Sequence, residues 1–398
     1  MTLDFDVTDW TALAEGEADA LIRLRRTIHT APELGLDCPA TCATLKAALA
    51  DLPLTIHDSI ATSGFVATLD GARPGRTVVL RGDMDALPID EATGLEFASR
   101  SPGKMHACGH DSHSAMLATA ARLLCRQRDR IAGRILFMFQ PGEEGHHGAR
   151  HMLAEGLLGD PLPQAAFALH VWPTLDHGAV ACRAGTMLAS TDMLSAAIIG
   201  KGGHAAMPHD ALDPIPVAAD IILALQSAVA RTTPPTDPIV LSITRVSAGT
   251  THNVLPDRVD LLGTLRALSP EGRARGRAAF ERICCHVAAA HGCTAEVAIE
   301  PGYPPTVNDP RAVALVRALA GDRFLQLSAS NMGGEDFSYI LEKIPGAMAF
   351  LGVAAPGSDL ASRAPLHNPA MVIDEAALTI GVALHCGFAT RFLERDWG

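Results

Sequence analysis

The sequence of 398 residues is poor in aromatic side chains, which make up 4% of it, and has no surplus of positive charge. Its net charge is −12. A surface that binds nucleic acid or an anionic membrane needs clustered lysine and arginine. We therefore expect neither of these partners, and we infer that the protein acts on a small molecule.

Long apolar runs and an export signal are also missing. Apolar stretches such as residues 221–225 and 287–290 are far shorter than the roughly 20 residues of a membrane helix. The first ten residues, MTLDFDVTDW, are acidic and lack the basic start and apolar run of a secretory signal. We expect a cytoplasmic protein. Its nine cysteines, an odd number without regular spacing, are then free thiols or metal ligands.

The composition that is present, 48% hydrophobic and 19% charged, is typical of a packed globular protein. Residues 13–50 have apolar positions at helical spacing and predict two helices separated by a turn. Short apolar strands are then expected at residues 77–80, 134–139 and 166–169, with helices at 113–126 and 148–158. Strands that alternate with helices predict an α/β fold, a mostly parallel sheet with helices on both faces.

The pattern changes between residues 184 and 299 to an α+β arrangement. Strands are expected at residues 195–199, 239–246 and 258–266, and helices at 215–230 and 270–291. After residue 304 the first pattern returns, with a buried strand at 347–353. A single core seldom grows beyond roughly 250–300 residues. We therefore predict a catalytic domain in two parts, residues 1–183 and 305–398, that is interrupted by a smaller domain at 184–304.

Charged and imidazole side chains follow three of the predicted strands. Asp83 and Asp85 follow the first, Glu143 and Glu144 the second, and His170 the third. Ligands of parallel sheets bind beyond the carboxyl ends of the strands. The sequence therefore predicts a site that is assembled along one edge of the sheet.

Cysteine, histidine and glutamate are the residue types that bind transition metals. Cys108 and His110 flank Gly109, so in a loop both can face one ion. A buried thiol at a helix cap explains that short cluster equally well. The adjacent carboxylates Glu143 and Glu144 are costly to bury without a cation or a proton. One can bind a metal while the other takes the proton of its water, unless the pair is merely solvated at a helix start.

Single histidines after strands are more often core or surface residues than ligands. The combination is what favours a metal site, because Cys108, His110, Glu144, His170 and His367 together supply enough ligands for two ions. Asp85 is suited to orient a ligating histidine through its second ring nitrogen. Capping of the following turn is an almost equally good explanation for Asp85.

Over nearly its whole length the sequence resembles the aminoacylase and carboxypeptidase clan of di-metal peptidases, most closely the branch of hippurate hydrolases and indole-acetyl-amino-acid hydrolases. The motifs that carry this resemblance are residues 81–88 (RGDMDALP), 105–111 (MHACGHD), 140–145 (QPGEEG), 170–173 (HVWP), 203–208 (GHAAMP), 253–257 (NVLPD), 263–266 (GTLR), 333–337 (GGEDF) and 366–369 (LHNP).

The resemblance implies that the five residues named above are the metal ligands and that Glu143 is the general base. It implies a zinc-exopeptidase-like catalytic domain with an inserted ferredoxin-like lid that pairs two subunits into a homodimer or a higher oligomer. The substrate contacts it implies are His204, Asn253, Arg266 and Gly334, with His204 reaching the partner's site. A salt bridge on the strand surface is the alternative role for Arg266.

The expected function is that of a metal-dependent amidohydrolase. It would cleave N-acetyl, N-benzoyl or aryl-acetyl amino acids to a carboxylic acid and a free amino acid, through a hydroxide held by two divalent ions. Mn, Zn, Co and Ni all suit the ligand set. Arg266 with Asn253 would bind the substrate carboxylate, and His204 the oxyanion.

Two other functions fit the same residues. A dipeptidase or aminopeptidase would need a group that recognises a free α-amine, and the sequence offers no obvious one. A catalytically silent binding protein on the same fold is disfavoured, because Glu143 and all five ligands are retained.

Overall fold

The computed structural model describes residues 7–397, which form two compact units. Unit 1 comprises residues up to Gly185, Val307–Ser328 and residues from Asp336 onward. Unit 2 comprises Thr186–Thr306 and Ala329–Glu335. Most of the acidic N-terminal segment lies outside the described residues, so the expectation that it is no export signal stays a prediction.

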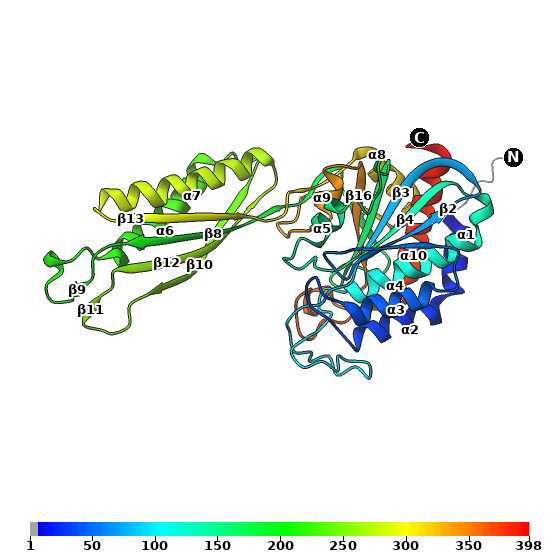
Figure 1. The fold of residues 1–398 in the computed structure, drawn as a ribbon, viewed down its shortest axis with the longest axis horizontal. Helices are drawn as coiled ribbons and strands as arrows, with labels where there is room; N and C mark the ends of the chain where they lie inside the picture. Colours follow the sequence, from blue (N-terminus) through cyan, green and yellow to red (C-terminus); the bar gives the residue numbers. More distant parts are fainter. Residues whose placement is uncertain (1–6, 398) are drawn as a thin grey trace. The chain divides into compact units, whose positions relative to one another are not determined.

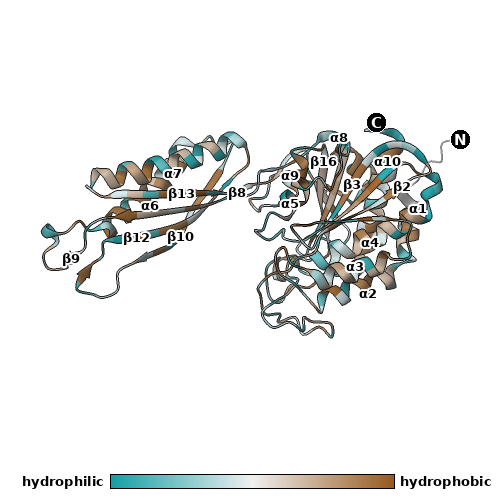
Figure 2. Cartoon of the chain, in the orientation of Figure 1, coloured by the Kyte–Doolittle hydropathy of each residue, from teal (hydrophilic) through white to brown (hydrophobic). Residues whose placement is uncertain are grey.

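Unit 1 contains an eight-stranded sheet in the order β1-β2-β4-β3-β5-β16-β6-β15 (Figure 1). Its four central strands, β4, β3, β5 and β16, are mutually parallel, so the predicted mostly parallel α/β sheet is confirmed. The strands are β1 Thr55–Asp58, β2 Phe65–Asp70, β3 Arg73–Asp83, β4 Ala132–Gln140, β5 Ala165–Trp172, β6 Val180–Cys182, β15 Phe324–Gln326 and β16 Gly346–Gly352. Hydrophobic residues predominate along these central strands (Figure 2).

Two long helices form the inner layer beside this sheet. The helices of unit 1 are α1 Val7–Glu15, α2 Ala18–His29, α3 Pro39–Leu49, α4 His110–Arg126, α5 Gly148–Ala154, α8 Pro310–Ala320, α9 Ser338–Leu341 and α10 Leu378–Arg395. Helices α4 and α10 pack against β3, β5 and each other. Both are buried around nearly their whole circumference, which requires a sequence without a wide polar face.

Two helices are long and apolar enough to cross a membrane by length and composition alone: Pro214–Thr232 (α6) and the segment Glu375–Arg395. This corrects the expectation that no stretch reaches that length. The apolar window of the second is 83% buried within the protein. In α6, Val217, Ile221 and Leu225 belong to the core of unit 2. Most apolar side chains of the second helix, and those on one face of α6, are therefore buried against the rest of the protein.

Unit 2 contains an antiparallel sheet in the order β10-β12-β8-β13 with α6 and α7 packed against it (Figure 1). Its main elements are β8 Ser190–Ile199, β10 Ile239–Ala248, β12 Arg258–Ala267, β13 Thr294–Pro301 and α7 Pro270–Ala290. Burial alternates along β12, as expected of a strand with one face in the core. Asp213 and Ser269 cap the two helices by accepting backbone N–H bonds, and proline follows each cap.

Several boundaries differ from those predicted. The central strands continue into the polar residues, so Asp83 and His170 lie inside β3 and β5 and do not follow them. Helix α4 begins at His110, which is therefore helical and not a loop residue. Helix α5 ends at Ala154, earlier than the predicted residue 158. The strand extensions come from ladder hydrogen bonds to neighbouring strands, which a hydrophobic pattern does not record.

Candidate metal centre

The carboxyl ends of β3, β4 and β5 bring the polar residues of unit 1 together. Arg81 and Asp83 are two residues apart in β3, and Asp85 continues the same spacing, so their side chains start on the same side of the extended chain. Glu143 and Glu144 follow β4, and His170 lies near the end of β5. The seven catalytic and metal residues predicted in unit 1 are gathered here. The parallel strand order accounts for those at strand ends, whereas Cys108, His110 and His367 come from the start of a helix and from loops.

The five predicted ligands form two overlapping groups that share one thiol. Cys108 Sγ lies 3.4 Å from His170 Nε2 and 3.3 Å from His367 Nε2. Glu144 Oε1 lies 3.2 Å from His367 Nε2 and 3.9 Å from His110 Nε2. The donor atoms of Cys108, His110 and His170 all lie within 4.8 Å of one another, as do those of Cys108, Glu144 and His367. Such a set has the donor types and the spacing for two ions around Cys108.

The backbone around Cys108 is held in unusual conformations. Gly109 has a φ of 84°, and a Cβ at this position would lie 2.3 Å from Val171 Cγ2, so only glycine fits. His367 has a φ of 63°, which is uncommon for a residue with a side chain. Its N–H donates to Ala107 O at 2.8 Å, which fixes His367 beside the thiol. Backbone strain of this kind clusters at functional sites.

The charges around the donors favour a bound cation. Burial lowers the pKa of His110, but the carboxylates of Asp83, Asp85 and Glu144 outweigh it and raise that pKa to about 10. Burial, then Glu144 and Glu143, raises the pKa of the Cys108 thiol well above its usual value. Both ring nitrogens of His110 are buried without a well-formed hydrogen bond. A field that would hold a proton on a buried imidazole also suits a divalent ion in its place, so the residues fit a metal centre.

Asp85 connects the carboxylate pair to the histidine. Its two oxygens accept the backbone N–H groups of Glu143, at 3.0 Å, and of Glu144, at 3.1 Å. Its Oδ1 also lies 3.4 Å from His110 Nδ1, which leaves Nε2 of that ring toward Glu144. Glu143 itself is 6% exposed and accepts the N–H of Asp336 at 3.4 Å. Asp85 thus has the contacts expected of a residue that orients a ligand.

A buried charge network lies beside the donors, and most of its members were not among the predicted site residues. Arg81 donates to Asp83 at 2.6 Å, to Gln140 at 2.9 Å and to Asp336 at 3.1 Å, with its side chain fully buried. Gln140 donates to Asp336 at 2.8 Å. His113 lies 2.6 Å from Asp83. Burial raises the pKa of Asp83, but Arg81, His110 and His113 hold it well below its usual value.

Two spacings in the sequence point to this network. His110 and His113 are three residues apart on a helix, so they share a face. Arg81 and Asp83 are two residues apart in an extended strand, the same spacing as between Asp83 and Asp85, so their side chains point to the same side. No local pattern identifies Asp336 as the partner of Arg81, because the two are 255 residues apart.

The four predicted substrate contacts lie in unit 2, in two places. His204 of β9 (Gly203–His204) pairs with Val254 of β11 (Val254–Leu255), next to Asn253. His204 and Asn253 both line a cavity of about 620 Å³. The N–H of Ala206 donates to His204 Nδ1 at 3.1 Å, so the neutral ring carries its proton on Nε2 and offers it as a donor.

Arg266 and Gly334 lie together at another place in unit 2. Arg266 is directly opposite Thr191 in the β12–β8 ladder. A Cβ on Gly334 would lie 2.2 Å from Thr191 Cγ2 and 3.5 Å from Arg266 NH1. Asp192 makes its ion pairs with Arg273 and Arg277, and in the described part of the chain Arg266 has none. The salt-bridge alternative for Arg266 therefore finds no partner among the described residues.

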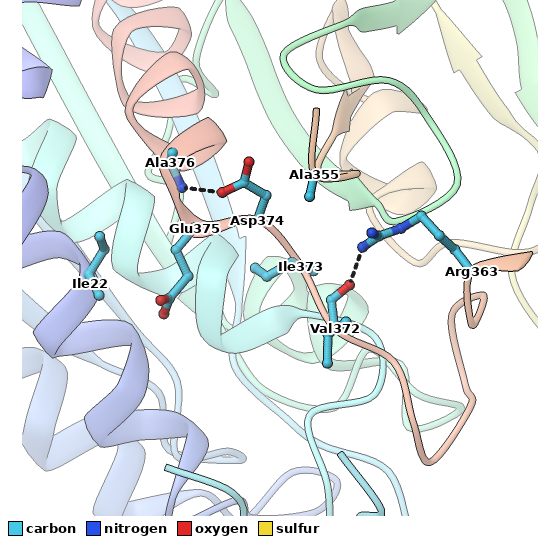
Figure 3. Close-up of a pocket in the computed structure, with 8 residues that line it drawn as sticks. All are labelled: Ile22, Ala355, Arg363, Val372, Ile373, Asp374, Glu375 and Ala376. Carbon is cyan, nitrogen blue, oxygen red and sulfur yellow. Dashed lines mark hydrogen bonds between the residues drawn. The ribbon is translucent and has the colours of Figure 1, made fainter. Parts of the chain in front are cut away.

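A separate depression in unit 1, of about 450 Å³, contains none of the predicted site residues (Figure 3). Its charged groups are already paired. Arg363 donates to the carbonyl oxygens of Pro173 and Val372, Asp374 accepts from Ala376 N and lies 2.9 Å from His177, and Glu375 pairs with Arg26. It therefore offers no free charged group to a ligand.

Comparison with known proteins identifies relatives over nearly the whole chain. The model of peptidase family M20/M25/M40 matches residues 79–391. An IAA-amino acid hydrolase from Arabidopsis thaliana is 37% identical over 384 residues, which cover 94% of this chain and 86% of the relative. An N-acetyl-L-cysteine deacetylase from Bacillus subtilis is 38% identical over 90% of this chain and 84% of the relative. A thermostable carboxypeptidase from Saccharolobus solfataricus is 35% identical over 94% and 95%.

Solved structures agree with this result. A dinuclear metal-binding peptidase of the M20 family from Bacillus subtilis superposes with a TM-score of 0.82 at 34% identity, covering 96% of this chain and 99% of that one. A protein from methicillin-resistant Staphylococcus aureus superposes with a TM-score of 0.90 at 28% identity, covering 97% and 99%. The fold and the sequence therefore lead to the same group of proteins.

Proposed function

Because the chain belongs to the M20/M25/M40 family of peptidases, we propose that it is a metal-dependent amidohydrolase of N-acyl amino acids. It is a hydrolase that acts on amide bonds, as its relatives are. The observation that carries the proposal is the pair of donor groups that share Cys108 beside the buried carboxylate of Glu143. The products would be a carboxylic acid and a free amino acid.

The proposed cofactor is a pair of divalent ions, Mn, Zn, Co or Ni, held by Cys108, His110, Glu144, His170 and His367. When bound, such ions polarise the amide carbonyl and lower the pKa of a water. Thiolate and imidazole ligands suit these transition metals better than they suit Mg or Ca.

The proton transfers are assigned to Glu143. Its position is fixed by the hydrogen bond from its N–H to Asp85 and by the N–H of Asp336 on its carboxylate. From there we propose that Glu143 removes the proton of the attacking water and delivers it to the leaving nitrogen. Asp85 acts on His110 and Glu143 by orienting them.

Substrate binding is assigned to unit 2. The guanidinium of Arg266 suits a bidentate carboxylate, with Asn253 as a further donor and the bare backbone at Gly334 leaving room beside it. The Nε2–H of His204 suits the oxygen that becomes negative during attack. His204 is exposed on its own chain, which agrees with a role in the site of a partner subunit.

We propose that unit 2 also pairs two subunits. Strand β10 is an edge of its sheet and exposes Val240 and Val246. Helix α6 exposes Ile215 and Leu223, the latter 68% accessible in the single chain. Unpaired edges and exposed apolar side chains of this kind are normally covered. The cytoplasmic location of such an oligomer stays a prediction.

A dipeptidase or carboxypeptidase is the second candidate, and the relative from Saccharolobus solfataricus favours it. Both functions remove an amino acid that has a free carboxylate, and they differ in whether the other side of the amide is a simple acyl group or an amino acid. The third hypothesis, a catalytically inactive binding protein, is disfavoured because Glu143 and the five ligand residues are all retained.

The decisive experiment measures hydrolysis of a panel of N-acetyl, N-benzoyl and indole-acetyl amino acids beside dipeptides. The metal-free protein is reloaded separately with Zn, Mn, Co and Ni. We expect turnover of at least one N-acyl amino acid at a higher kcat/KM than any dipeptide. A preference for dipeptides would replace the proposal by the second candidate, and metal binding without any turnover would favour a binding protein.

The ligand role of Cys108 has its own test. All nine cysteines are free thiols in the described chain, and Cys285 is the only one of them that is not buried. A metal-bound thiolate is protected from alkylation, so removal of the metal should add one labelled site at Cys108, and reloading should remove it. Peptide mapping identifies the thiol. Rapid labelling of Cys108 in both the metal-loaded and the metal-free protein would exclude it as a ligand.

A further inference from the structure

His113 is a fully buried imidazole with both ring nitrogens engaged, and the proposed mechanism does not use it. It lies one helical turn after His110 on α4 and is 1% exposed. Its Nδ1 is 2.6 Å from Asp83 Oδ1, and its Nε2 accepts the backbone N–H of Val171 at 2.9 Å. A backbone N–H can only donate, so Nε2 carries no proton and Nδ1 donates to Asp83.

Val171 is the residue after His170, at a point where β5 loses one of its neighbours. The β3–β5 ladder ends at Arg81 opposite Ala168, whereas the β16–β5 ladder continues to Trp172. Beyond the end of the β3 ladder, His113 Nε2 is the acceptor for Val171 N–H. His113, from α4, therefore supplies the hydrogen-bond acceptor at this end of β5 that a neighbouring strand supplies elsewhere along it.

The ring of His170 is fixed by the same surroundings. Its Nδ1 lies 2.8 Å from Val171 O, which leaves Nε2 toward Cys108. The ring of His113 packs against it edge-on, with the centroids 4.7 Å apart. Both the backbone that carries His170 and one face of its ring thus depend on His113.

Asp83, His110 and His113 also lie close enough to hold a metal ion themselves. Two contacts argue against that role. The guanidinium of Arg81 occupies Asp83 Oδ2 and is itself held by Asp336. The only unprotonated nitrogen of His113 is taken by Val171. The group is therefore suited to supporting a metal ligand and not to binding an ion.

We propose that His113 is a positioning residue: held by Asp83, it accepts the N–H of Val171 and so sets the ring of His170 for the metal. The inference rests on the proposed ligand set. Groups that orient metal ligands typically change metal affinity by 10–100-fold when they are removed.

The test separates the two contacts of the ring with two amides. His113→Gln places an oxygen where Nε2 stands and keeps the acceptor for Val171. His113→Asn places an N–H donor where Nδ1 stands and keeps the bond to Asp83. His113→Leu removes both. The measurement is the affinity of the metal-free protein for each of two zinc ions, by competition with a chromophoric chelator, together with the Tm of the metal-free protein.

We expect His113→Leu and His113→Asn to bind one of the two zinc ions 10–100-fold more weakly, and His113→Gln to stay within about threefold of wild type. His385→Leu is the matched control, since His385 is equally buried in unit 1 on α10, against Phe167. It should leave both zinc affinities unchanged.

The other possible results would contradict either the proposed function or the proposed role of His113. Wild-type protein that binds no zinc would contradict the proposed function. Two tight zinc ions in wild type that are unchanged in His113→Leu would overturn the inference alone. Recovery by Asn and not by Gln would show that the bond to Asp83 is what matters, and loss of folding in all three variants would show a role in folding; either overturns the proposal.

Discussion

The two units present their candidate functional residues in opposite ways. In unit 1, Cys108, His110, Glu143 and His170 are between 0% and 8% exposed, and His367, with a side chain 53% exposed, is the exception. In unit 2, His204 and Asn253 are exposed on short strands and loops. Buried groups in unit 1 are held by other side chains, such as Asp85, whereas the ring of His204 accepts a hydrogen bond from the backbone of its own loop.

This difference agrees with separate proposed roles for the two units, catalysis in unit 1 and substrate or subunit contacts in unit 2. Chemistry that moves protons and binds metals needs fixed donors away from water, because electrostatic interactions are stronger there and cost no reorganisation. Residues that must meet a mobile substrate or another subunit have to be on the surface. The proposed metal ligands of unit 1 are therefore mostly held by buried contacts, whereas the proposed contacts His204 and Asn253 of unit 2 are accessible on the surface. The four predictions below test this comparison.

The largest effect is expected in unit 1, from Glu143→Gln. The amide keeps the shape but cannot take a proton, so kcat should fall by about 10²–10⁴-fold, the range for removal of a general base. Metal content, measured by elemental analysis, should stay at the wild-type value. Full activity in the metal-loaded variant would show that the proton acceptor is another group.

Arg81→Met tests whether buried charge holds unit 1 together. The change leaves Asp83 and Asp336 buried beside each other without their cation, which should cost about 3–5 kcal/mol of unfolding free energy. Arg258→Met in unit 2 is the matched control, because its pair with Asp260 is about half exposed and should contribute little to the unfolding free energy. Denaturant unfolding measures both. Equal losses would erase the contrast between the units.

Arg266→Met should affect binding more than chemistry. Loss of a hydrogen-bonded charge costs about 1.5–3 kcal/mol, so KM for an N-acyl amino acid should rise by roughly 10–100-fold. The kcat should change much less. A substrate whose carboxylate is esterified should respond little to the variant. If kcat falls while KM is unchanged, Arg266 acts on the transition state and not on the carboxylate.

The smallest departure from wild-type activity is expected when two inactive variants are mixed. If His204 completes the site of the partner subunit, Glu143→Gln and His204→Ala chains form hybrid dimers with one intact site. With equal amounts and random pairing, half the dimers are hybrid, so activity should return to about one quarter of wild type. Tagged co-purification shows whether hybrids form. Hybrids that stay inactive would place the action of His204 within its own subunit, or remove its role.

Some features were predictable because they depend on local pattern. The alternation of apolar strands and helices was enough for the α/β class. The Glu143–Glu144 pair stands out at the end of an apolar strand, and Cys108 with His110 stands out as a short cluster of metal-binding residue types before a helix. Strand ends and the start of α4 were misplaced by a few residues. Those limits depend on ladders with neighbouring strands and on the left-handed backbone of Gly109, which hydrophobic spacing does not encode.

The sequence by itself determined which chemistry this protein has available, because the residue types, their order and the strand pattern are local properties. Only the tertiary structure decided which groups act together. Arg81 meets Asp336 across 255 residues, and His113 meets the backbone beside His170 across 58. Such contacts arise when separate strands and helices pack into one buried layer, where every charge and every N–H must find a partner. No pattern within a segment specifies that partner.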